Sequence, residues 1–279
     1  MLSLEKLVEK SSSLGTLPAI VFRVFEVMDD PNSTATMIGR IVNDDPALTA
    51  RLLKLVNSPF YGFAAKVDTV YRAIALLGHR ELRSVVLAAS AVKVFDGIPT
   101  ELVSMPVFWK RSLYTAVVAR VLAAYRRDRE IERYFIAGLL HDIGSLLMYL
   151  RLPDEMTQVL QQESDAPVWQ RESDIIGYNH AEVGGLLLKK WSLPPILCQA
   201  VEFHLYPEKA PKDSRDAAWL IHLANQIQRY HGERDPQLAA DAEIDTAIWE
   251  SAGLGAEILP QVLEKAGQQF EASRDALLS

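Results

Sequence analysis

The sequence has few of the residues that several protein classes require. It contains one cysteine, Cys198, among 279 residues, which excludes a disulfide framework and a zinc cluster built on cysteine. No apolar run reaches the roughly 18 residues that a membrane-spanning helix needs. The N-terminus lacks the uninterrupted apolar stretch of a signal peptide. From these absences we expect a cytoplasmic protein in a reducing compartment, without membrane contact.

Positive charge is also scarce. The chain has 29 basic and 36 acidic side chains and a formal net charge of −7 at pH 7. Binding duplex nucleic acid over a broad surface needs a basic face, so we expect no nucleic-acid partner. Hydrophobic residues at 49% and charged residues at 23% are ordinary globular values, and they exclude a disordered or fibrous chain.

Strand-like alternation bounded by hairpin dipeptides is missing, whereas helical periodicity is present almost everywhere. Asp45 and Pro46 predict a helix start, with Asp45 as N-cap, and residues 57–59 predict the end of that helix. Gly78 separates a short helix from a longer one. Further helices are expected at residues 17–28, 106–126, 131–150, 153–163, 180–190, 195–203, 213–230 and 244–272. The predicted fold class is all-α.

The most informative stretch contains His141 and Asp142 within an apolar segment predicted to be helical. Neighbouring helix positions point about 100° apart, so both side chains reach one ion only at the edge of the helix's inner face. Burying the pair is costly unless both groups have partners. The doublet alone leaves two interpretations open, a buried hydrogen-bonded pair or part of a metal site.

Other motifs occur in order around this doublet. They are Pro18-Ala-Ile, Asn43-Asp-Asp-Pro46-Ala-Leu, Asn57-Ser58-Pro59, Ala73-Ile-Ala-Leu-Leu-Gly78, Phe108-Trp109-Lys-Arg111-Ser112, His180-Ala-Glu-Val-Gly-Gly185 and Trp191-Ser-Leu-Pro194. Over residues 12 to 230 the set resembles the HDOD domain, a bacterial signalling output domain related to the HD superfamily of metal-dependent phosphohydrolases. The resemblance implies an all-α, two-lobed, HD-like helical fold.

The resemblance also suggests a domain organisation. We expect an HDOD domain at 1–230, with an N-terminal helical lobe at about 1–97 and an HD-like lobe at about 106–230. A helical extension follows at 231–279, and composition leaves open whether it caps the fold or mediates a homodimer.

The resemblance further implies a metal-site pattern, from which this chain departs. HD hydrolases hold a divalent ion with an upstream histidine, the His-Asp doublet and a closing aspartate, and the phosphodiesterase branch adds further histidines between the doublet and that aspartate. Here the first position is Arg111, which has no lone pair for a metal, and the last is Asn225, which carries no charge. Repulsion between a guanidinium and a divalent ion in near contact costs several kcal/mol even at an effective dielectric of about 20. The candidate pocket comprises Arg111, His141, Asp142, His180, His204 and Asn225.

We therefore predict a degenerate site without metal, cofactor or catalytic residue, in which Arg111 pairs with Asp142. The predicted function is a regulatory module that relays a signal to a protein partner. The alternative is a phosphohydrolase or phosphodiesterase acting on a (cyclic) nucleotide with Mn or Fe. In that case the ligands would be His141, Asp142, His180 and His204. A third hypothesis is a sensor that binds a nucleotide without cleaving it.

Three further residue groups have simple structural interpretations. His222 is expected at the edge of the core and Cys198 within it. Gly184 and Gly185 lie inside a predicted helix without a preceding strand, so they indicate close helix packing rather than a nucleotide loop.

Overall fold

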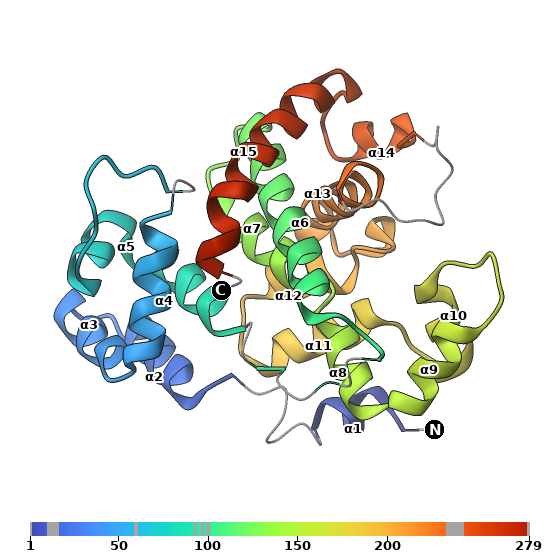
Figure 1. Cartoon of the computed structure of the whole chain (residues 1–279), viewed down its shortest axis with the longest axis horizontal. Coiled ribbons are helices and arrows are strands. Elements are labelled where there is room, and N and C mark those ends of the chain that lie inside the picture. The colour runs from blue at the N-terminus through green and yellow to red at the C-terminus, as the bar shows by residue number, and fades with distance from the viewer. Residues whose placement is uncertain are drawn as a thin grey trace. The chain divides into compact units, whose positions relative to one another are not determined.

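The computed structural model describes residues 2–9, 17–58, 61–91, 94–95, 98, 101–232 and 243–277 (Figure 1). Throughout these ranges the regular elements are helices, and the prediction of an all-α fold is confirmed. Pro59, part of the predicted helix end, lies outside the described residues.

The chain divides into two compact units. The larger unit comprises residues 1–15 and 95–266, and the smaller comprises 16–94 and 267–279. The smaller unit contains α2 (Ala19–Asp29), α3 (Ala35–Asn43), α4 (Pro46–Val56), α5 (Val70–Ala91) and the C-terminal part of α15 (Leu259–Leu277). The larger unit contains α1 (Leu4–Glu9), α6 (Met105–Tyr125), α7 (Ile131–Leu140), α8 (Ile143–Arg151), α9 (Pro153–Gln161), α10 (Val168–Ile176), α11 (His180–Lys190), α12 (Pro195–Glu202), α13 (Lys212–His231) and α14 (Thr246–Ser251), with short 3-10 turns at Pro207–Lys209 and Ala256–Ile258.

Local signals set the helix ends of the smaller unit. The Asp45 carboxylate accepts hydrogen bonds from the backbone N–H groups of Ala47 (3.0 Å) and Leu48 (2.9 Å), which confirms the predicted N-cap of α4. At the other end, the Asn57 amide donates to the carbonyl of Leu53 at 2.7 Å. Gly78 has φ 75° inside α5, a conformation that favours glycine, and it kinks the helix where a break was predicted.

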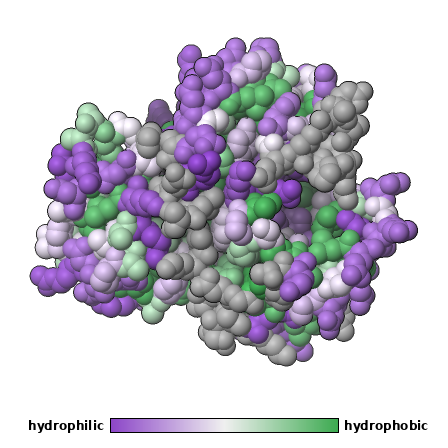
Figure 2. Space-filling view, in the orientation of Figure 1, coloured by the Kyte–Doolittle hydropathy of each residue, from purple (hydrophilic) through white to green (hydrophobic). Residues whose placement is uncertain are grey.

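Helix α6 is the central element of the larger unit. It packs on α7 and α13 and has buried residues on nearly every side, as expected of a helix that is apolar all round. Helix α11 packs on α8 and α12, and α12 continues the contact to α13. Figure 2 shows hydrophilic residues over much of the visible surface, with apolar patches between them.

Two glycines allow α8 and α11 to cross closely. A Cβ at Gly144 would clash with the backbone carbonyl of His180 and would lie 2.6 Å from the amide nitrogen of Gly184. The glycines of α11 therefore serve close packing, as predicted, and the crossing brings the start of α11 beside the His-Asp doublet.

The N-terminal residues belong with the larger unit, although the sequence assigned them to the N-terminal lobe. Helix α1 packs on α11, because the Lys190 ammonium donates to the carbonyls of Val8 (2.7 Å) and Glu9 (3.3 Å) at its C-terminal end. The Tyr178 hydroxyl donates to the carbonyl of Leu2 at 3.2 Å.

In the described part of the chain, no single helix is long and apolar enough to cross a membrane. The segments Ile131–Arg151 and Pro153–Gln161 are long and apolar enough only when they are taken together, and they meet at a bend of 113°.

Candidate functional site

The His-Asp doublet lies at a helix junction rather than inside one helix. The sequence predicted an uninterrupted helix over 131–150, but α7 ends at Leu140 and α8 begins at Ile143. Asp142 has φ −105° and ψ 13°, outside the helical region, and it occupies the N-cap position of α8. The prediction was wrong because the backbone turns at the doublet. This turn releases the two side chains from the fixed 100° offset between neighbouring positions of a continuous helix.

The two side chains of the doublet have separate partners. The ring Nδ1 of His141 donates to the carbonyl of Gly138 at 2.8 Å, and the Asn225 side chain hydrogen-bonds to the same imidazole. The Ser145 hydroxyl donates to Oδ1 of Asp142. Asp142 is part-exposed at the pocket surface, whereas His141 is buried.

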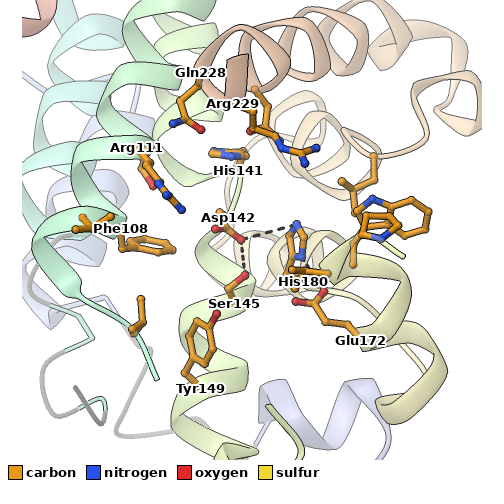
Figure 3. A pocket seen from close by; sticks show the side chains of 18 of the residues that line it. Phe108, Arg111, His141, Asp142, Ser145, Tyr149, Glu172, His180, Gln228 and Arg229 are labelled. Atoms are coloured by element: carbon orange, nitrogen blue, oxygen red, sulfur yellow. Dashed lines mark hydrogen bonds and ion pairs between the residues drawn. The ribbon is translucent and has the colours of Figure 1, made fainter. Parts of the chain in front are cut away.

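His180 is positioned by the first turn of α11. Asn179 caps this helix and forms a reciprocal capping box with Glu182. Both the backbone N–H of His180 (2.9 Å) and its Nδ1 (2.7 Å) donate to Oε2 of Glu172, whose side chain is 1% exposed. On the other side of the ring, Nε2 lies 3.8 Å from Oδ1 of Asp142. Figure 3 shows the imidazole between the two carboxylates.

The electrostatic environment shifts the pKa values of the site's histidines in opposite directions. Burial opposes the charged form of His180, but attraction by Glu172 and Asp142 outweighs it and raises the pKa of His180 to about 9. Burial lowers the pKa of His141, and it lowers that of His204 well below the usual range. His180 is consequently an imidazolium at neutral pH, beside two neutral imidazoles.

His204 is buried behind the other two rings. Its side chain is 0% exposed, and its ring centroid lies 5.3 Å from that of His141 and 5.6 Å from that of His180. Its Nδ1 donates to the carbonyl of Val201 at 2.7 Å, and its Nε2 has no hydrogen-bond partner among the described residues. His222 donates from Nδ1 to the carbonyl of His204 at 2.7 Å, a core-edge position as expected.

A pocket of about 560 Å³ opens over this cluster. Five of the six predicted site residues line it, namely Arg111, His141, Asp142, His180 and Asn225, and His204 lies behind them. Figure 3 shows the Arg111 guanidinium pointing into the pocket near Asp142. The ion pair described for Asp142 is with His180, and the predicted pairing of Asp142 with Arg111 stays a prediction.

Sequence reasoning missed three residues that define the pocket: Glu172, Tyr149 and Arg229. Glu172 lies on α10, and the sequence did not predict this helix. Helices α1 and α3 were not predicted either. A signal for it exists, because Trp169, Glu172 and Ile176 share one face at helical spacing. A single carboxylate on an apolar helix face indicates a buried charge that needs a partner.

The donor set does not fit a divalent ion. Among the residues that the structure describes, no group of three or more His, Cys, Asp or Glu side chains could hold a metal. Both ring nitrogens of His180 face carboxylates, Arg111 contributes a cation to the pocket, and Asn225 binds His141. Metal ligation by histidine requires a neutral imidazole, and the raised pKa of His180 removes that residue as a donor.

Comparison with known proteins places the chain in a family. The HDOD domain family matches residues 14–207, which is more than half of the sequence. The chain belongs to the HDOD family. The HDOD match covers Arg111, the His-Asp doublet, His180 and His204, but it ends before α13, which carries Asn225 and Arg229.

Solved structures share the HDOD fold over the full chain. An HDOD domain protein of Geobacter sulfurreducens is 23% identical with a TM-score of 0.80, covering 99% of this chain and 98% of that one. A candidate phosphohydrolase of Shewanella amazonensis is 26% identical with a TM-score of 0.76, covering 97% of each chain. A candidate signal transduction protein of Marinobacter aquaeolei is 19% identical with a TM-score of 0.73, covering 99% of this chain and 65% of its own.

A curated relative from Treponema pallidum, described as an uncharacterized protein, is 24% identical over 225 residues. The alignment covers 80% of this chain and 43% of that protein, so the chain matches less than half the length of its relative.

Proposed function

We propose that this HDOD protein is a non-catalytic signal-transduction module built on a hydrolase-like scaffold with a degenerate metal site. The observation that carries the proposal is the position of His180 between Glu172 and Asp142, at 2.7 and 3.8 Å. An HD hydrolase needs a histidine with a free lone pair here. In this chain both ring nitrogens face carboxylates instead.

The charges around the ring support the same proposal. The pocket presents Arg111 where a hydrolase has its first histidine, and Asn225 where it has its last carboxylate. A metal-activated hydroxide requires a cation held by anionic or neutral donors. In the proposed site the side chain of Arg111 supplies positive charge in place of a metal cation. The pocket then resembles a hydrolase site that lacks its ion.

The comparisons are compatible with both an enzyme and a signalling protein, because the neighbours include a candidate phosphohydrolase and a candidate signal transduction protein. We favour signalling because of the site residues. The proposed output is contact with a signalling protein in the cytoplasm, and formation of a homodimer is a further proposal from the sequence.

Metal content and turnover test the proposal together. Purified protein is analysed for bound metal, then assayed with cyclic and linear nucleotide phosphodiesters in the presence of added Mn or Fe. We expect substoichiometric metal and no turnover above that of the variant His141→Ala. The matched control is His79→Ala, which removes an exposed histidine from the smaller unit.

One outcome contradicts the proposal outright. It is stoichiometric metal together with turnover that His141→Ala abolishes and His79→Ala leaves unchanged. That result would establish the phosphohydrolase alternative.

A further inference from the structure

Three neutral polar side chains of the pocket lack hydrogen-bond partners. They are Ser112 on α6, Tyr149 on α8 and Gln228 on α13. Ser112 is 1% exposed and Gln228 is 5% exposed, yet no residue in the described part of the chain pairs with either side chain. The part-buried Tyr149 hydroxyl is likewise without a partner among the described residues. Buried polar groups in native proteins are normally paired, so water or a ligand must supply the missing partners.

The three groups reach one cavity from different helices. Figure 3 shows the Tyr149 hydroxyl and the Gln228 amide directed into the pocket. Burial raises the pKa of Tyr149 above its usual range, so the phenol keeps its proton and can donate it to a hydrogen bond. A glutamine amide both donates and accepts, and a serine hydroxyl does the same. Together they form a neutral surface that offers both donors and acceptors.

The charged groups of the pocket are less available to a ligand. Arg111 and Arg229 already have interaction partners within the molecule. His180 lies between Asp142 and Glu172. An anion in the pocket would lie near the Asp142 carboxylate, and a cation would lie near Arg111 and His180. A ligand charge of either sign therefore meets a like charge, which favours a neutral ligand.

The mouth of the same pocket is apolar. Val107 (37% exposed) on α6 and Leu160 (39% exposed) on α9 are large exposed apolar side chains, and both line it. The rings of Phe108 and Trp169 line it as well. The volume of about 560 Å³ lies within the range of roughly 300–1,000 Å³ typical of small-molecule sites. Water alone could satisfy the polar groups but would leave this apolar surface uncovered, whereas an organic ligand covers it.

We propose that the pocket binds a neutral organic molecule with a flat apolar body and an amide or lactam edge. The body lies against Phe108 and Trp169, because aromatic rings pack well on flat apolar surfaces. The edge pairs with the side chains of Ser112, Tyr149 and Gln228, since adjacent N–H and C=O groups match the two ends of a glutamine amide. The inference rests on the proposed function and deepens it, because this ligand would be the signal that a non-catalytic module detects.

Three bicyclic probes test the inference on the full-length protein. Carbostyril carries adjacent N–H and C=O groups, quinoline has nearly the same body without them, and quinaldate carries an anionic head on that body. Calorimetric titration measures the affinity of each. We expect carbostyril to bind one site at least about tenfold more tightly than the other two, because it alone can pair with both ends of a glutamine amide without bringing a charge.

Variants separate a binding role from a structural one. Gln228→Leu and Tyr149→Phe should each weaken carbostyril binding about tenfold and leave quinoline binding unchanged. Each removes a polar group without a described partner, so the unfolding temperature of the ligand-free protein should stay the same or rise. A side chain with a structural role would lower it instead. Gln158→Leu removes an exposed glutamine of α9 that does not line the pocket, and this matched control should leave carbostyril binding unchanged.

Three results overturn the inference. Carbostyril shows no binding at about 1 mM, quinaldate binds more tightly than carbostyril, or both pocket variants bind carbostyril like the wild type. Metal content and turnover are measured on the same preparations without probe. Stoichiometric metal with turnover would contradict the proposed function even where carbostyril binds, so the two failures are distinguishable.

Discussion

The two units differ in what they bury. In the described part of the smaller unit, the buried polar residues are Ser58, Ser90 and Ser273, and each hydroxyl donates to a carbonyl three or four residues earlier in the chain. The larger unit instead buries charged and titratable groups from several helices, namely His141, Arg171, Glu172 and His204.

The proposed site lies in the unit that buries charged groups. A serine bonded to its own helix satisfies a local need and adds little constraint, whereas a buried charge is costly unless the surrounding fold supplies a partner. In the larger unit, buried His141 and Glu172 both line one pocket, and His204 lies behind them. The described core of the smaller unit shows no comparable cluster, which is consistent with a role in packing.

The largest effect is expected from removing the partner of His180. Glu172→Ala leaves a buried imidazolium with one distant carboxylate, and we expect the free energy of unfolding to fall by about 4 kcal/mol. Urea titration followed by tryptophan fluorescence measures it, because all five tryptophans lie in the larger unit. The control Glu163→Ala removes an exposed carboxylate and should change stability by less than about 0.5 kcal/mol. A similar loss in both variants would show that the buried contact of Glu172 with His180 is not the cause.

The second effect is a pH dependence confined to the larger unit. The pKa of His180 is raised from 6.5 to about 9, so its contribution is fully present below pH 6.5 and is lost as the pH rises through 9. We expect the free energy of unfolding to fall by roughly 3 kcal/mol over that interval.

The variant His180→Gln should flatten this profile when tryptophan fluorescence is monitored. Below pH 6.5 stability should fall as well, because the depressed pKa values of His141 and His204 mean that unfolding takes up protons there. A profile that stays steep in the His180 variant would assign the titration to another group.

A third prediction concerns the crossing of α8 and α11. Gly144→Ala places a methyl group against the backbone of His180 and Gly184, and we expect a loss of about 2 kcal/mol together with a weakened pH dependence. The control Gly267→Ala, in α15, meets no atom within 4 Å and should stabilise the protein by about 0.5 kcal/mol. Both are measured by thermal unfolding, and equal signs would contradict the packing argument.

The smallest effect is expected in the core of the smaller unit. Ser90→Ala removes a hydroxyl that donates to the carbonyl of Val86, which keeps its helical bonding, so stability should change by less than about 1 kcal/mol. Circular dichroism is the appropriate measurement, since tryptophan fluorescence reports on the other unit. A loss comparable to that of Glu172→Ala would show that both cores are equally sensitive.

Much of the fold could be predicted because its signals are local. The cap at Asp45, the kink at Gly78 and the start of α11 at His180 each depend on a few neighbouring residues. The predicted break-free helix through His141 was wrong because apolar periodicity continues across the junction and hides the backbone turn.

The site was predicted only in part, for a related reason. Arg111, His141 and His180 were found because each occupies a recognisable motif position. Glu172 was missed because its contact depends on the turn between two helices, in which Gly177 ends α10 with φ 93° and Asn179 caps α11. His180 lies eight positions after Glu172, and only the turn between their helices brings the two side chains into contact.

The sequence by itself determined that this is an all-α HDOD protein, because helix periodicity and ordered motifs are properties of the chain alone. The tertiary structure decided which of the candidate site residues contact one another. Pairing between Glu172, His180 and Asp142 depends on the close crossing of α8 and α11 and on the position of α10. Such contacts join distant segments, and no local pattern specifies the distances on which their electrostatics depend.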